Sequence, residues 1–211
     1  MQNPKLVKAT LKEGSFFQIY DEEDYTLQNQ VIQKEFIEHQ VIDHPTFEGC
    51  AFENVLFSEN TFTRLEVTDC IFKNCDFSNA NLQQSTIHRT QFVDCKLVGT
   101  KFSESYLGNV LFKECYMPFS NFSDSKIKSV GFEKSDLSNG DIVESNLQIT
   151  TFTECKLENI NLYDTSLRKI DLSSCHFDTL DTQKENIRGC ILNQFQAIYF
   201  AQKYLAIQIK G

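Results

Sequence analysis

The stretch CKLVGTKFSESYLGNVLFKEC, residues 95–115, places a large apolar side chain at every fifth residue: Leu97, Phe102, Leu107 and Phe112. This period matches neither an α-helix, at 3.6 residues per turn, nor a β-strand, at two. The same step gives 27 consecutive large apolar residues from position 47 to position 177, with no insertion. The chain is therefore an internal repeat of five residues, and the repeat decides the fold.

A second register, two residues before each apolar position, holds mostly small side chains, and all eight cysteines lie in it. The other three positions of each pentad are mostly polar. Two inward and three outward positions predict a chain that turns a corner in every pentad. Because four corners close a square, one coil should take about 20 residues, and coils should stack at the strand spacing of about 4.8 Å.

Residues 20 apart match as this geometry requires. One column is made of six phenylalanines, Phe52, Phe72, Phe92, Phe112, Phe132 and Phe152. A neighbouring column from position 67 to position 167 contains only aliphatic residues. The sequence thus predicts an all-β solenoid in which aromatic rings fill one side of a square section.

The pentads CDFSN (75–79), ANLQQ (80–84) and SDLSN (135–139) resemble those of the pentapeptide-repeat proteins, and the resemblance extends over residues 47–192. It implies a right-handed quadrilateral β-helix of pentapeptide repeats. The stretch STIHRTQFVDCKLVGTKFSESYLGNVLFKEC (85–115) and the terminus NQFQAIYFAQKYLAIQIKG (193–211) also resemble the Qnr quinolone-resistance proteins of the Gram-positive chromosomal type.

The second resemblance implies a homodimer joined through the C-terminal segment. It also implies DNA mimicry, with DNA gyrase and topoisomerase IV as partners and protection of these enzymes from fluoroquinolones. Some members carry projecting loops that are needed for full protection, and the unbroken frame from 47 to 177 has no room for one. Any protection must then come from the faces and ends of the solenoid.

Three segments are expected. Residues 1–26 form an N-terminal extension or cap. Residues 27–192 form the β-helix, regular from 47 and irregular before it, because Tyr25, Gln30, Glu35 and Gln40 are unsuited to a tight core. Residues 193–211 form a helix capped by Asn193 and a short strand over 206–209.

The terminal helix either closes the last coil or also forms a dimer interface, since its apolar groups are too many to face one coil end. The predicted interface residues are Phe195, Ile198, Tyr199, Ala201, Tyr204, Leu205 and Ile207.

The formal net charge of −9 argues against direct binding of nucleic acid, which requires a concentrated basic surface. One set of acidic residues recurs every 20 residues and should form a vertical column: Glu104, Asp124, Glu144 and Asp164. A second column, interrupted by Lys134, comprises Asp94, Glu114 and Glu154. Either these positions merely tolerate charge, or the rod presents regularly spaced negative charge that resembles duplex DNA.

No enzymatic chemistry is indicated. The four histidines lie outside the inward registers, and the sequence has no nucleophile, phosphate-loop or metal-ligand spacing, so we expect no catalytic residue, cofactor or metal. The cysteine column is linear, unlike a tetrahedral zinc site, and is expected to consist of reduced core residues. With neither a signal peptide nor a membrane-spanning run, a cytoplasmic location and no membrane contact are expected.

Two functional hypotheses remain. The first is a DNA-mimicking protein that binds type II topoisomerase and protects it from fluoroquinolones. The second is a generic β-helical protein-binding scaffold with no topoisomerase role, in which the acidic columns are incidental.

Overall fold

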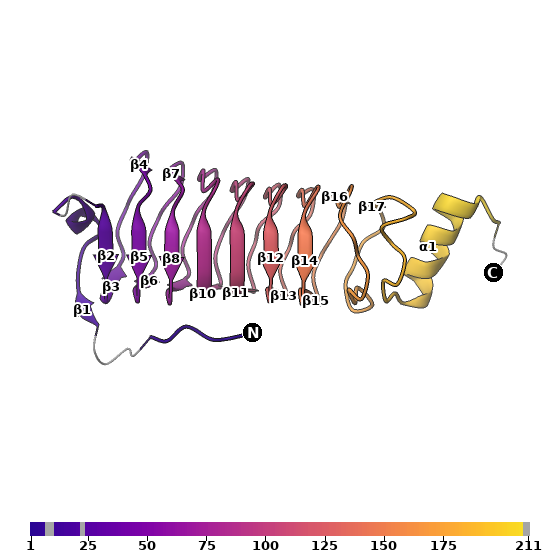
Figure 1. The fold of residues 1–211 in the computed structure, drawn as a ribbon, viewed down its shortest axis with the longest axis horizontal. Coiled ribbons are helices and arrows are strands. Elements are labelled where there is room, and N and C mark those ends of the chain that lie inside the picture. Colours follow the sequence, from indigo (N-terminus) through magenta and orange to yellow (C-terminus); the bar gives the residue numbers. More distant parts are fainter. Residues whose placement is uncertain (7–10, 22–23, 209–211) are drawn as a thin grey trace.

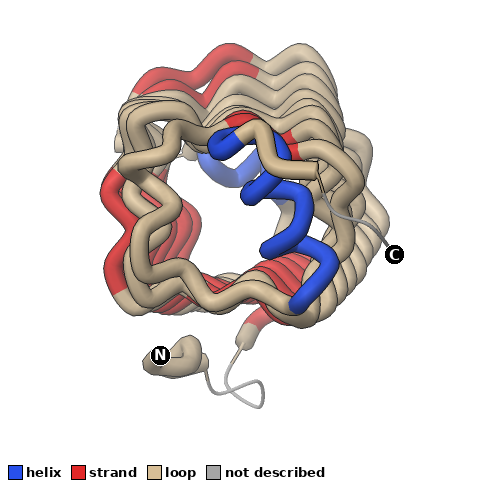
Figure 2. The backbone as a smooth tube through the Cα atoms, turned by 90° about the vertical axis from the view of Figure 1, so that its right-hand side faces the viewer, coloured by secondary structure: helices blue, strands red, loops and turns tan. Residues whose placement is uncertain are grey.

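The computed structural model describes residues 1–6, 11–21 and 24–208. The chain forms a right-handed β-solenoid of about 8 turns, followed by helix α1 (Gln194–Leu205) at one end of the rod (Figure 1). Viewed along the rod, the coils superpose as a square with strands on its sides (Figure 2). The fold predicted from the five-residue period is confirmed.

Most strands are two to four residues long because the backbone turns a corner in every pentad. In the first half of the solenoid the strands are β1 (Lys12–Glu13), β2 (Thr26–Gln28), β3 (Gln30–Gln33), β4 (Val41–Asp43), β5 (Thr46–Glu48), β6 (Ala51–Glu53), β7 (Thr61–Thr63), β8 (Glu66–Thr68) and β9 (Ile71–Lys73). In the second half they are β10 (Thr86–Val93), β11 (Tyr106–Lys113), β12 (Lys126–Lys128), β13 (Gly131–Glu133), β14 (Asn146–Gln148), β15 (Thr151–Thr153), β16 (Ile160–Asn161) and β17 (Leu180–Asp181). Of these, β10 and β11 continue through one corner and have eight residues each.

Neighbouring coils pair in parallel with a constant offset of 20 residues. In β9, β10 and β11 this register aligns Phe72 with Phe92 and Phe92 with Phe112. Isolated bridges continue the same offset on another face, as between Lys96 and Tyr116. Each coil therefore lies directly over the previous one, and residues 20 apart share a column.

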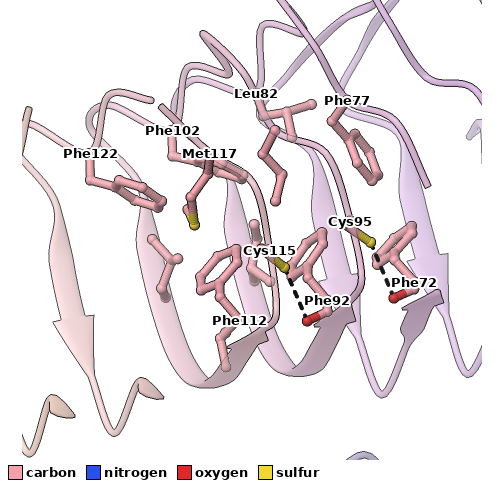
Figure 3. Packing of buried hydrophobic residues seen from close by; sticks show 14 of the residues in the cluster. Phe72, Phe77, Leu82, Phe92, Cys95, Phe102, Phe112, Cys115, Met117 and Phe122 are labelled. Carbon is pink, nitrogen blue, oxygen red and sulfur yellow. Dashed lines mark hydrogen bonds between the residues drawn. The ribbon is translucent and has the colours of Figure 1, made fainter. Parts of the chain in front are cut away.

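The phenylalanine column lines one side of the core (Figure 3). Successive rings from Phe52 to Phe152 stack with centroids 4.8, 4.9, 4.9, 5.1 and 5.0 Å apart. All 27 apolar positions of the five-residue frame are buried except Leu147 and Phe177, which are partly buried. Identical rings one coil apart thus fill the interior with the same spacing as the backbone ladder.

The corners of the square lie in the left-handed backbone region. Corner residues such as Asn54, Asn74 and Asn139 have φ of 57°, 52° and 58°. Asparagine and glycine adopt this conformation at the lowest cost, which explains why they recur at corners. A corner amide donates to the next coil, as from Glu104 N to the Ser123 carbonyl at 2.9 Å.

All eight cysteines are free, and seven of them are buried, as their register predicts. Cys95 donates its thiol to the carbonyl of Phe72, and Cys115 donates to the carbonyl of Phe92, both at 3.4 Å (Figure 3). Burial raises the pKa of the Cys95 thiol above its ordinary value. A neutral, packed thiol is a small core residue with little reactivity.

The first coil corrects one expectation. Strands β2, β3 and β4 pair with β5, β6 and β7 at the same 20-residue offset, so the backbone of residues 27–46 is not irregular. The polar residues that suggested irregularity bind the N-terminal cap instead. Glu35 accepts a hydrogen bond from Phe16 N at 2.9 Å, and Tyr20 donates to Gln40 at 2.7 Å.

That cap is the 3₁₀ helix Phe16–Tyr20, which buries Phe16 and Ile19 completely over the open end of the first coil. Ahead of it, residues 1–6 lie along the outside of the rod (Figure 1, Figure 2). Gln2 N donates to Asn109 and Lys5 N donates to Asp69, each at 2.8 Å. The N-terminal segment therefore spans two coils of the outer surface.

The C-terminal end is closed by α1. Asn193 caps the helix through Gln196 N at 3.0 Å, as the sequence predicts, and Gln196 completes a capping box. The Gln196 amide also donates to the carbonyls of Leu172 and Cys175 in the last coil. The helix ends at Ala206 in the left-handed region. The strand expected over 206–209 is absent from 206–208, and residue 209 lies outside the described residues.

Candidate functional site

The acidic side chains singled out from the sequence all lie at corners of the solenoid and are exposed. Glu104, Asp124, Glu144 and Asp164 occupy one corner column, with φ between 51° and 59°. Asp94, Glu114 and Glu154 occupy another, with φ between 53° and 55°. Corner backbone is fixed by hydrogen bonds between coils, so each carboxylate is carried outward from a rigid position.

The two acidic columns lie at opposite corners of the square. Glu104 and Glu114 are ten residues apart, which is half of the 20-residue coil. In the square section that Figure 2 shows, the two acidic positions of a coil therefore lie across a diagonal. One flat partner surface cannot contact both columns, whereas a concave surface that embraces the rod can.

The negative charge of these columns is largely uncompensated. Within residues 1–6, 11–21 and 24–208, the only ion pair made by the seven carboxylates joins Glu154 to Lys134 at 4.0 Å. Glu104 also accepts a hydrogen bond from the neutral amide of Gln84 at 2.9 Å. Lys134 therefore neutralises the second column locally, as the sequence suggested, while the first column keeps its charge.

Glutamate at these corners carries a conformational cost. A left-handed residue with an ordinary side chain is roughly 1–2 kcal/mol less favourable than the right-handed alternative, and asparagine or glycine reduces that cost. Glu114 and Glu154 are nevertheless glutamates in a column where Asn54 and Asn74 show that asparagine fits, and Glu104 and Glu144 occupy equivalent corners. The corner backbone alone does not account for carboxylates at these sites.

The diagonal that joins the two acidic columns divides the surface of the rod into two sides. The Asn109 side comprises the two faces that meet at the corner column of residues 69, 89, 109, 129, 149 and 169. The Phe119 side comprises the two faces that meet at the column of residues 59, 79, 99, 119, 139 and 159. The acidic columns form the two boundaries between these sides.

The Asn109 side carries unpaired basic residues and is partly covered by the N-terminal segment. It exposes Lys126, Lys128, Arg168 and Lys169, and none of the four forms an ion pair within the described parts of the chain. The N-terminal segment lies on this side, bound to Asp69 and Asn109. Arg89 is paired there with Asp69 through hydrogen bonds of 2.7 and 2.6 Å.

The Phe119 side presents exposed aromatic side chains that the sequence analysis did not single out: Phe36, Tyr116, Phe119 and Tyr163. Tyr116 is 53% exposed and Phe119 is 60% exposed. The available signal was an aromatic residue at an outward position of the pentad, where polar residues prevail. Lysines 96 and 156 on this side are paired with Asp76 and Asp136 at 3.2 and 3.4 Å.

The residues predicted for a dimer interface divide into two groups. Phe195, Ile198, Leu205 and Ile207 are exposed. Tyr199 and Tyr204 instead contact the last coil: Tyr199 donates to the Leu180 carbonyl at 3.1 Å, and Tyr204 donates to the Thr182 carbonyl. Ala201 is partly buried between the two faces. The helix therefore caps the solenoid with one face and leaves a second apolar face uncovered.

The remaining polar groups are dispersed. His39 and His44 contact Glu59 and Glu66 at 3.2 and 2.9 Å near the N-terminal end. Among the described residues, no group of three or more His, Cys, Asp or Glu side chains is arranged to hold a metal ion. No helix in that part of the chain is long and apolar enough to cross a membrane.

Comparisons with known proteins match the repeat. Residues 65–142 match the family model described as a pentapeptide repeat region, and residues 18–102 match the model described as the SV2A/B/C luminal domain. A search of curated proteins finds no match. Membership of the Gram-positive chromosomal Qnr type stays a prediction.

Several solved structures are similar to this chain. One is full-length QnrB1, a plasmid-mediated fluoroquinolone resistance protein: it is 20% identical, with a TM-score of 0.42, and the match covers 84% of this chain and 100% of that one. Another is HetL, a pentapeptide repeat protein involved in heterocyst differentiation regulation in the cyanobacterium Nostoc sp. strain PCC 7120. It is 12% identical, with a TM-score of 0.41, and the match covers 80% and 90% of the two chains.

Proposed function

We propose that this chain binds a type II topoisomerase, DNA gyrase or topoisomerase IV, in place of duplex DNA, and so protects the enzyme from fluoroquinolones. The observation that carries the proposal is the pair of acidic columns on opposite corners of a straight rod. A duplex likewise presents two lines of negative charge on its two flanks. The resemblance of residues 85–115 and 193–211 to Qnr proteins supports the same partner.

The charge density favours a DNA mimic. Seven carboxylates lie between positions 94 and 164, which span three and a half coils of 20 residues. At a rise of about 4.8 Å per coil, and with Lys134 offsetting one carboxylate, this corresponds to about one net negative charge of the columns per 2.8 Å of rod. Duplex DNA carries about one per 1.7 Å. A basic groove built for DNA would therefore meet a weaker but comparable field.

The proposal includes a homodimer. The uncovered apolar face of α1, formed by Phe195, Ile198, Leu205 and Ile207, would pack against its counterpart in a second copy. Two rods joined at their C-terminal ends would double the length of the acidic surface. The proposed complex needs no catalytic group, cofactor, membrane or direct nucleic-acid contact by this chain, and its place of action is the cytoplasm, where the topoisomerase works.

A supercoiling assay tests the function. Purified gyrase is assayed with ciprofloxacin and increasing amounts of this chain, and the expected result is recovery of supercoiled product. The variant Glu104→Lys/Glu144→Lys should lose the effect. The control Glu48→Lys/Glu66→Lys changes the net charge equally but lies outside both columns, and it should behave as the original chain. No rescue and no binding at micromolar protein would contradict the proposal.

A generic protein-binding scaffold is the second candidate. The ion pair between Lys134 and Glu154 favours it, because a lysine within an acidic column weakens any imitation of DNA. A scaffold for an unrelated partner predicts no binding to either topoisomerase. It also predicts no difference between the column variant and its charge-matched control.

A further inference from the structure

A single half-coil combines both acidic columns with exposed aromatic residues. Residues 114–124 begin at the corner carboxylate of Glu114 and end at the corner carboxylate of Asp124. Between them, Tyr116 is 53% exposed and Phe119 is 60% exposed. Phe119 thus lies at the corner midway between the two negative boundaries of the Phe119 side, and Tyr116 lies on the face between Phe119 and Glu114.

The backbone conformation of Phe119 is energetically unfavourable for an aromatic residue. Its φ of 61° places a bulky aromatic residue in the left-handed region, whereas the corners before and after it in the same column are Gly99 and Asn139. Burial of the ring does not offset that cost, because the ring is mostly exposed. Gly99 has no side chain with which to cover it. A strained and exposed aromatic residue is an outlier that points to a role outside the folded chain.

Tyr106 on the opposite side shows the contrasting arrangement. Its ring lies over Gly108, so closely that a side chain at Gly108 would meet the tyrosine hydroxyl at 2.7 Å. Tyr106 is therefore packed along its own face and is 36% exposed. No described aromatic ring stacks on Tyr116 or Phe119. These two rings are available to a partner, whereas that of Tyr106 covers its own coil.

The charges distinguish the two sides further. On the Asn109 side, Lys126, Lys128, Arg168 and Lys169 would repel a basic partner, and the N-terminal segment already covers part of the surface. On the Phe119 side, Lys96 and Lys156 are neutralised by Asp76 and Asp136, which leaves Lys101 as the one exposed lysine of that side without an ion pair among the described residues. A basic partner that embraces both acidic columns is therefore better accommodated on the Phe119 side.

We infer that this chain docks by its Phe119 side, with Tyr116 and Phe119 as central anchors and the acidic columns as the flanks. The complementary surface is a basic groove with an apolar recess in its floor. The inference rests on the proposed function, in which that groove is the duplex-binding surface of the topoisomerase. The flanking charges accelerate encounter, and the desolvated aromatic side chains slow dissociation.

The test compares two corner substitutions with opposite expectations. Phe119→Asn places at the corner a residue that suits the left-handed region, so folding is retained. Ile149→Asn is the matched control, because Ile149 is also an exposed apolar corner residue, at φ 53° and 75% exposed, but on the Asn109 side. Binding of each variant to immobilised gyrase and topoisomerase IV is measured by surface plasmon resonance, and thermal denaturation checks the fold.

The expected result is that Phe119→Asn weakens binding at least tenfold, chiefly through faster dissociation, while Ile149→Asn binds as the original chain. Neither substitution should lower the melting temperature. If the original chain binds and Phe119→Asn binds equally well, the docking side is wrong while the proposed function stands. Weaker binding by Ile149→Asn alone would assign docking to the Asn109 side. If the original chain binds neither enzyme, the proposed function itself is contradicted, and the inferred partner with it.

Discussion

Phe92 and Phe112 stack with their ring centroids 4.9 Å apart and their planes inclined by 9°, although they belong to successive coils. The stacking distance of about 5 Å is close to the strand spacing of about 4.8 Å, so backbone ladder and core impose the same rise. The corner residues Glu104 and Asp124 belong to the same two coils and inherit this rise. The core therefore sets the spacing of the acidic column.

Removing one ring from the stack should destabilise the solenoid. Phe112→Ala is expected to lower the free energy of unfolding by about 3–5 kcal/mol, through lost burial and the cavity left between Phe92 and Phe132. Phe112→Leu retains most of the volume and should cost less. Chemical denaturation of both variants measures the difference. A loss below about 1 kcal/mol for the alanine variant would show that neighbouring coils collapse into the gap.

Replacing the corner glutamates by asparagine should raise stability while reducing function. Glu104→Asn/Glu144→Asn removes like charges from one column and places a residue favoured in the left-handed region at both corners. The melting temperature should increase, and the gain should shrink in high salt as repulsion is screened. Binding to topoisomerase should weaken in the same variant. An unchanged or lower melting temperature would refute the conformational cost assigned to these glutamates.

The pair of Asp69 and Arg89 should make stability depend on pH. Hydrogen bonds from the Arg89 guanidinium hold the pKa of Asp69 below its usual range. The ionised form is thus favoured in the folded state, so the contribution is fully present above the unfolded pKa of about 3.9. It is lost as the pH falls through the lower folded pKa.

Asp69→Asn is therefore expected to lower the free energy of unfolding by about 1–3 kcal/mol at pH 7, with the difference shrinking below pH of about 4. Denaturation curves measured from pH 2 to pH 7 give this dependence. Asp43→Asn is the control: Asp43 pairs with Arg64, but both side chains are 56% exposed, so solvent screening should leave a smaller effect. If the difference in free energy of unfolding between Asp69→Asn and the original chain grew towards low pH, the stabilising role of the ionised Asp69 carboxylate would be contradicted.

The uncovered face of α1 should control the oligomeric state. Phe195→Glu/Leu205→Glu introduces charge on that face without touching the buried Phe200, and it is expected to give a folded monomer. Sedimentation equilibrium measures the mass, and circular dichroism checks the solenoid. Ile149→Glu, an exposed apolar residue away from the helix, is the control and should leave the dimer intact. A dimer that survives the helix substitutions would place the interface elsewhere.

Much of the fold can be predicted from the sequence because each pentad must bury one large apolar side chain in the same way. A side chain such as Leu97 must enter the core once per corner, and residues 20 apart must share a column. Glu35 and Gln40 were misleading because their polar side chains bind the N-terminal cap, whose 3₁₀ helix has no five-residue signature. The contacts of the N-terminal segment were unpredictable for a different reason, since Gln2 and Lys5 bind through backbone amides.

The candidate site could be predicted only in part. The 20-residue recurrence of Glu104 and Asp124 was visible, and the ten-residue offset of Glu114 already implied the opposite corner. The left-handed conformation of these corners was not visible, because the sequence there alternates acids, asparagine, glycine and even phenylalanine. The conformational cost of glutamate and of Phe119 at these corners could therefore be recognised only from the backbone φ angles.

Competition between this chain and a linear DNA duplex for DNA gyrase tests the central claim most directly. Fluorescently labelled duplex bound to gyrase is titrated with this chain, and the titration is repeated at several duplex concentrations. A DNA mimic predicts complete displacement, an apparent affinity that falls in proportion to the duplex concentration, and weaker binding as salt increases. A ternary complex that retains both the duplex and this chain would contradict the claim.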